Sequence, residues 1–166
     1  AGSNGILGCE FYAAGGSRFE KSGTEFGNKY YHLVLLAKDV EGWRNLVQLA
    51  SLAYTEGFYY KPLIDDELLE RFSRGLVCST ACIAGEVPQL ILGGKAEAAE
   101  RKILHWRELF GKDSFFLEIQ DHGMSEEKTV NRAFVELSRR TGVPLVATND
   151  MHYLEREDAV AHDAML

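Results

Sequence analysis

Short apolar runs alternate along this chain with stretches in which apolar residues recur every three or four positions. Strands that are apolar over nearly their whole length are typical of a parallel sheet buried on both faces, and the other stretches have the pattern of amphipathic helices. The predicted strands cover residues 6–14, 31–37, 75–81, 114–120 and 144–150, and the predicted helices cover residues 40–54, 66–72, 96–110 and 125–140, with a last helical segment from about residue 155. Together they predict an α/β fold, a parallel sheet with helices on its outside.

Length and composition fit a single domain over residues 1–166. The chain has 166 residues, of which 46% are apolar and only 3 are proline, which is enough to bury one core. Its 25 acidic against 18 basic residues give a net charge of -7, so general attraction to a polyphosphate backbone is not its dominant property. Neither a membrane span nor a secretory signal is visible, which predicts a soluble, cytoplasmic protein.

Side chains that can bind metal gather where the predicted strands end. In parallel α/β sheets the reactive groups lie just past the carboxyl ends of the strands. The first strand carries Glu10, the third runs into Cys82, and the last runs into Asp150 and His152. These residue types at neighbouring strand ends predict a metal site there.

The sharpest motif is Asp150-Met151-His152. Residues two apart on an extended segment point to the same face, so the two side chains can bind one ion or two neighbouring ions. A carboxylate oxygen and a neutral imidazole nitrogen suit zinc, manganese or iron better than calcium. The more frequent alternative for an isolated D-x-H is that Asp150 caps the following turn and His152 packs against it.

Glu10 and His32 form a pair only under one arrangement of the first two strands. His32 stands at the start of its apolar run, whereas Glu10 lies toward the end of the preceding one. Antiparallel pairing of the two strands makes these residues neighbours, and the long Gly-rich loop between them permits either arrangement. The alternative for Glu10 is a solvated acidic residue near a strand end.

Cys82 is the cysteine best placed to bind metal, because small residues surround it at the end of the third strand. An inert core thiol is the default for any cysteine, and Cys9 and Cys78 are interpreted in that way. Three cysteines without a CxxC pair predict reduced thiols. The G-x-S-x-G, P-loop and G-x-G-x-x-G motifs of esterases, NTPases and dinucleotide-binding proteins are missing.

Longer strings in the sequence closely resemble the PHP (polymerase and histidinol phosphatase) domain of bacterial DNA polymerase III alpha subunits. The strings span nearly the whole chain, and they are GCEFY, YHLVLLAKDVEGWRNLVQLASLAYTEGFYYKPLID, CIAGEVPQLIL, FFLEIQDHG and PLVATNDMHYLEREDAVAHDAML. YTEGFYYKP and ATNDMHYL, in this order and spacing, are the most specific.

The resemblance implies a PHP-type distorted (β/α)7 barrel whose strand ends hold up to three divalent metal ions, zinc or manganese. Matched residue by residue, the family's ligand positions fall on Glu10, His32, Cys82, Asp150 and His152. The H-x-H strand that opens the family is missing from this sequence, so we expect an incomplete fragment of the barrel. The fourth strand runs into Glu118 and His122, which could support the ligands without binding the metal, and the resemblance assigns neither of them a ligand role. It indicates no separate catalytic residue.

The resemblance also implies a function, as part of the catalytic alpha subunit of a DNA-directed DNA polymerase in DNA replication. A PHP domain with an intact site acts as a metal-dependent 3'-5' exonuclease. The implied partners are DNA, the proofreading exonuclease subunit and the sliding clamp, and no membrane. The alternatives are a noncatalytic scaffold for the proofreading subunit and a stand-alone PHP phosphoesterase. Because ligands are missing, we expect residues 1–166 alone to be inactive.

Overall fold

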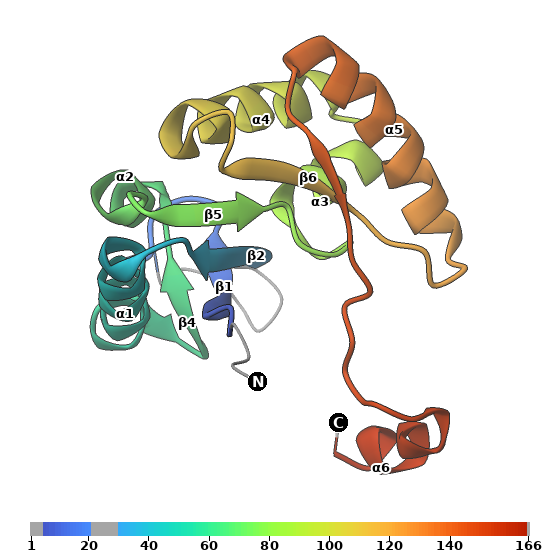
Figure 1. Ribbon diagram of the computed structural model, residues 1–166, viewed down its shortest axis with the longest axis horizontal. Coiled ribbons are helices and arrows are strands. Elements are labelled where there is room, and N and C mark those ends of the chain that lie inside the picture. Colours follow the sequence, from blue (N-terminus) through green and yellow to red (C-terminus); the bar gives the residue numbers. More distant parts are fainter. Residues whose placement is uncertain (1–4, 21–29, 166) are drawn as a thin grey trace.

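Figure 1 shows the computed structural model of the chain, which describes residues 5–20 and 30–165. The strands are β1 (Gly8–Ala14), β2 (Tyr30–Ala37), β3 (Phe58–Tyr59), β4 (Lys61–Ile64), β5 (Leu76–Ser79), β6 (Phe115–Ile119) and β7 (Leu145–Ala147). The helices are α1 (Val40–Thr55), α2 (Asp66–Phe72), α3 (Glu86–Leu92), α4 (Ala96–Phe110), α5 (Ser125–Thr141), the 3-10 helix η1 (Arg156–Asp158) and α6 (Ala159–Asp163). The sequence pattern does not predict β4 and α3, because each contains a proline that weakens the signal for its element.

The sheet is mixed, with the strand order β3-β4-β1-β2-β5-β6-β7. β1 is parallel to β4, and β5, β6 and β7 are parallel to one another. β2 is antiparallel to both of its neighbours, β1 and β5. The expectation of an all-parallel sheet is therefore wrong for β2, and the antiparallel alternative for the first two strands is correct.

The helices lie on the outside of the curved sheet (Figure 1), as the sequence predicts. α1 lies against β2 and β4, α4 against β5 and β6, and α5 against β6 and β7. In the core beneath α4, Trp106 and Phe115 meet edge to face, with ring centroids 5.8 Å apart. The buried stripe of α1 is narrower than its periodicity indicates, because Trp43 and Val47 are exposed. The interpretation of Cys9 as a core thiol is wrong, because the first three residues of β1 are exposed.

Local signals place the helix ends. Asp39 caps α1 by accepting a hydrogen bond from the Gly42 amide at 2.8 Å. Asp65 caps α2 and accepts a hydrogen bond from the Leu68 amide at 3.2 Å. Gly142 ends α5 in the left-handed conformation, with φ 73°. These caps satisfy backbone groups that a helix leaves unpaired at its ends.

Gly42 and Gly75 allow the start of α1 to touch the turn before β5. A Cβ on Gly42 would lie 1.8 Å from the Gly75 carbonyl oxygen. The contact is between backbones, so no flexible side chain can move aside.

We expect Gly42→Ala to destabilise the chain by about 2 kcal/mol, because the added methyl overpacks a backbone contact. Helix propensity alone predicts the opposite sign, a gain of about 1 kcal/mol. Urea unfolding measures the difference. Ser51→Ala on the exposed face of the same helix is the matched control, and a stabilised Gly42→Ala variant would contradict the close contact.

Arg18 is a buried cation that fixes the loop after β1. Its Nη1 donates to both carboxylate oxygens of Asp65, at 2.9 and 3.1 Å, and its backbone amide donates to the same carboxylate at 2.9 Å. Its Nη2 donates to Glu56 at 2.8 Å, and Nη1 also reaches Glu67 at 3.0 Å. Arg18 and Asp65 are 3% and 4% exposed. The loop is thereby tied to the cap of α2.

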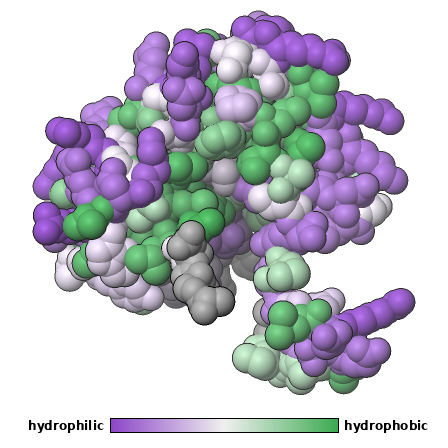
Figure 2. All heavy atoms as spheres, in the orientation of Figure 1, coloured by the Kyte–Doolittle hydropathy of each residue, from purple (hydrophilic) through white to green (hydrophobic). Residues whose placement is uncertain are grey.

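The chain beyond β7 leaves the sheet and runs to η1 and α6 (Figure 1). Figure 2 shows these last residues as a separate lobe joined to the body by a narrow neck. Leu154 and Val160 in this segment are exposed. None of the helices within the described ranges is both long and apolar enough to cross a bilayer.

Candidate metal centre

The strand directions bring Glu10 and His32 together. In the β1–β2 register His32 faces Tyr12, so Glu10 is its diagonal neighbour on the same face of the sheet. His32 Nδ1 lies 3.1 Å from Glu10 Oε1. The pair that the sequence joins only under antiparallel pairing is therefore in contact.

Cys82 joins this pair from the loop after β5. Its Sγ lies 3.5 Å from the same His32 Nδ1. The loop is fastened to β2, because the His32 amide donates to the Ala84 carbonyl oxygen at 3.1 Å. Ala81, immediately before Cys82, has a φ of 57°, a conformation that L residues rarely adopt and that tight surroundings must hold.

The electrostatics of this cluster oppose a thiolate. Burial raises the pKa of the Cys82 thiol, and the carboxylates of Asp150 and Glu10 raise it further. Negative carboxylates beside a thiol disfavour a second negative charge, and a bound cation reverses that balance. The cluster therefore has the charge pattern of a cation site.

Asp150 and His152 do not lie on one extended face as the sequence motif predicts. β7 ends at Ala147, and Asp150 has a φ of 45°, so the chain turns at this residue. The Asp150 carboxylate still raises the pKa of the Cys82 thiol. The His152 ring, in contrast, lies beside the ring of His162, with the ring centroids 5.5 Å apart. His152 Nδ1 lies 2.8 Å from the Asp150 carbonyl oxygen. His152 thus lines a second cavity, of about 410 Å³, together with His122 and His162.

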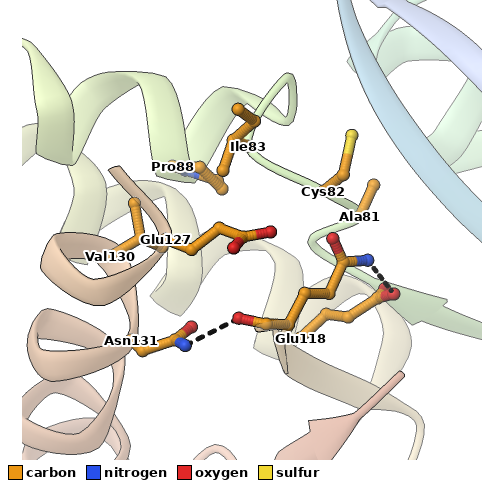
Figure 3. A pocket seen from close by; sticks show the side chains of 9 residues that line it. Ala81, Cys82, Ile83, Pro88, Glu118, Glu127, Val130 and Asn131 are labelled. Atoms are coloured by element: carbon orange, nitrogen blue, oxygen red, sulfur yellow. Dashed lines mark hydrogen bonds between the residues drawn. The ribbon is translucent and has the colours of Figure 1, made fainter. Parts of the chain in front are cut away.

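Glu118 connects the ends of three strands through its hydrogen bonds, and the sequence assigns it no ligand role. Figure 3 shows it beside a small cavity that Cys82 also lines. The buried Glu118 carboxylate accepts hydrogen bonds from the hydroxyls of Ser79 and Thr148 and from Gln120 Nε2. These bonds connect β5, β6 and the end of β7. A carboxylate after an apolar strand is the available sequence signal, but its hydroxyl partners lie on strands distant in sequence.

The donor types fit a zinc- or manganese-like ion, although the cluster is not a complete coordination sphere. Glu10 offers oxygen, His32 nitrogen and Cys82 sulfur, a mixture typical of zinc sites. Across the described ranges, no group of three or more His, Cys, Asp or Glu side chains has the arrangement of a metal site. The three side chains do not surround a common empty position, because His32 Nδ1 lies directly against both the Glu10 carboxylate and the Cys82 thiol.

Together, the mixed sheet with helices on its outside and the contact of His32 with Glu10 and Cys82 define an α/β domain with one Glu-His-Cys cluster on β1, β2 and the loop after β5. The family model of the PHP domain matches residues 1–122. The chain belongs to the PHP domain family, and it is a partial segment of the full domain.

Curated relatives are DNA polymerase III alpha subunits. The chain is 51% identical to that of Treponema pallidum over 165 residues, which is 99% of this chain and 14% of the relative. It is 48% identical to that of Borreliella burgdorferi over 100% of this chain and 14% of the relative, and 48% identical to that of Thermus aquaticus over 97% and 13%. The chain thus spans about 14% of the length of the first two relatives.

Proposed function

We propose that this chain provides the divalent-metal site of a 3'-5' exonuclease within a DNA polymerase III alpha subunit that works in DNA replication. The observation that carries the proposal is the contact of His32 in β2 with both Glu10 in β1 and Cys82 in the loop after β5. The similarity to DNA polymerase III alpha subunits supports DNA replication as the setting. In that setting the partners are DNA, the proofreading exonuclease subunit and the sliding clamp, in the cytoplasm.

Glu10, His32 and Cys82 are the residues that would hold zinc or manganese ions, with Asp150 and His152 as further ligands and up to three ions in the complete domain. Such ions lower the pKa of a bound water and offset the charge that builds on a phosphate during hydrolysis. The chain's own contribution is to present the ligands. Cys82 must release its proton, and His32, with its backbone fixed to Ala84, must turn an unprotonated Nδ1 toward the ion.

A noncatalytic scaffold is the second candidate, and the same contact favours it. His32 and Glu10 already contact each other across β1 and β2 without any metal, although such a partly exposed pair is worth at most about 1 kcal/mol to the sheet. A scaffold would contact the proofreading subunit and would need no hydrolysis.

The experiment that separates the two uses the full-length polypeptide, purified free of the proofreading subunit, and 5'-labelled single-stranded DNA. We expect shortening of the label-bearing strand from its 3' end, its loss after chelation, and its return when Mn²⁺ or Zn²⁺ is added back. Nucleotide incorporation in Mg²⁺ reports on the fold of the same preparation. Active incorporation without any metal-dependent shortening would favour the scaffold.

A further inference from the structure

The His122 side chain connects the loop after β6 to the segment that follows β7. Its Nδ1 lies 2.6 Å from Glu127 Oε1, and its Nε2 lies 2.7 Å from the Asn149 carbonyl oxygen. A carbonyl oxygen and an ionised carboxylate only accept hydrogen bonds, so the ring donates from both nitrogens. One side chain thereby bridges the start of α5 to the residue before Asp150.

The Glu127 end of this bridge is firmly fixed. Glu127 is 2% exposed, and its carboxylate also accepts from the backbone amides of His122, at 2.7 Å, and Met124, at 3.3 Å. Although burial opposes its ionisation, the hydrogen bonds from His122 lower the pKa of Glu127. The bond to Glu127, and then the bond to Asn149, raise the pKa of His122. Both shifts favour the charged pair, which makes charge-assisted hydrogen bonds.

The other end of the bridge is the Asn149 carbonyl, and the residue before it is fixed by several hydrogen bonds. Thr148 is held by Glu118 and Gln120 at the end of β7, and its amide donates to the Ile119 carbonyl oxygen at 3.2 Å. Two residues later Asp150 takes a φ of 45°. Aspartate adopts this left-handed region more readily than most non-glycine residues, so the turn marks the point where the chain leaves the direction of β7. The Asn149 carbonyl, which His122 holds, lies between the anchored Thr148 and the turned Asp150.

We propose that His122 is a positioning residue that clamps the Asn149 carbonyl to Glu127 and so fixes the place of Asp150, the candidate ligand that follows Asn149. Its part in metal binding rests on the proposed function, whereas the clamp itself does not. The Asp150 carboxylate raises the pKa of both the Cys82 thiol and the His122 ring. The His122 side chain is 42% exposed, so it works through its two hydrogen bonds and buries little apolar surface.

Two conservative variants separate the two bonds. Gln at position 122 places an amide donor near the site of the imidazole Nε2 and can keep the bond to Asn149. Asn, which is shorter, places its donor near the site of Nδ1 and loses that bond. A role in packing alone would make the two variants similar.

The test is hydrogen–deuterium exchange of the full-length polypeptide, followed in the peptide that contains residues 145–152. We expect His122→Ala and His122→Asn to speed exchange of this peptide by about fivefold or more, because loss of the clamp lets the end of β7 open locally. His122→Gln should stay within about twofold of wild type, and so should His105→Ala, a histidine on α4 outside this region. Unchanged exchange in His122→Ala, or equal effects of Asn and Gln, would overturn the clamp.

Mn²⁺ binding separates the clamp from the proposed metal site. Mn²⁺ binding at the proposed site is the binding that wild type shows and His32→Ala lacks. We expect His122→Ala to weaken it by roughly tenfold, the usual effect of losing a group that orients a ligand. If wild type and His32→Ala bind Mn²⁺ equally, the proposed function fails while the exchange result still decides the clamp. Tight Mn²⁺ binding that His122→Ala leaves unchanged would overturn the positioning role toward metal.

Discussion

Replacing Arg18 by methionine is expected to lower the free energy of unfolding by about 3–5 kcal/mol, the usual cost of removing one partner from a buried ion pair. Arg18 is 3% exposed and donates to Asp65, Glu56 and Glu67. Methionine fills much of the same space, so the loss comes from the Asp65 carboxylate, which is left buried beside two other acids. Urea unfolding followed by Trp fluorescence measures the change.

Two further variants make the Arg18 prediction specific. Arg101→Met removes an arginine that is 71% exposed and makes an i,i+4 pair with Glu97, so we expect a change within about 0.5 kcal/mol. Asp65→Asn keeps a good helix cap and removes the charge, so the Arg18→Met/Asp65→Asn double variant should be more stable than Arg18→Met. Equal stability of the single and double variants would show that the buried carboxylate is not the cause.

Replacing His32 by alanine is expected to lower metal-dependent hydrolysis in the full-length polypeptide by about a hundredfold or more, since it removes the side chain that joins the cluster. Its Nδ1 is the atom that faces both Glu10 and Cys82. The rate of 3' shortening of labelled single-stranded DNA measures the effect, with nucleotide incorporation as the measure of an intact fold.

The matched control is His105→Ala. His105 lies on α4, 3.8 Å from Asp66 and apart from the cluster, so its loss should leave hydrolysis unchanged. Equal loss of hydrolysis in both variants, or equal loss of hydrolysis and incorporation in His32→Ala, would indicate a general effect on the fold.

The sequence predicts most of the elements because their signals are local. Apolar runs and helical periodicity locate β1, β2, α1, α4, β6 and α5, and Gly142 ends α5 as expected. The direction of β2 is not local, since it depends on which strands pair, and the long loop before it leaves that choice open. The Arg18 cluster is also missed, because its partners Glu56, Asp65 and Glu67 lie 38 to 49 residues away.

In the candidate site too, features with a local sequence signal are predicted and features that depend on distant contacts are missed. Residue type and the predicted strands single out Glu10 and Cys82, antiparallel pairing of the first two strands adds His32, and the structure brings His32 into contact with both. The same-face argument for Asp150 and His152 fails because it assumes an extended backbone, and the φ of 45° at Asp150 breaks that assumption. The bridging role of His122 is invisible in the sequence, because it depends on a carbonyl oxygen 27 residues further along the chain.

The central claim, that Cys82 and His32 bind one divalent ion, is tested most directly by the near-ultraviolet absorption spectrum of the Co²⁺-loaded full-length polypeptide. A thiolate bound to Co²⁺ produces an intense charge-transfer band. We predict this band in wild type, its loss in Cys82→Ser, and its loss or marked weakening in His32→Ala, whereas Cys78→Ser, which alters a buried thiol in β5, should retain it. A wild-type protein that takes up Co²⁺ without the band, or a band that survives in Cys82→Ser, would contradict the account.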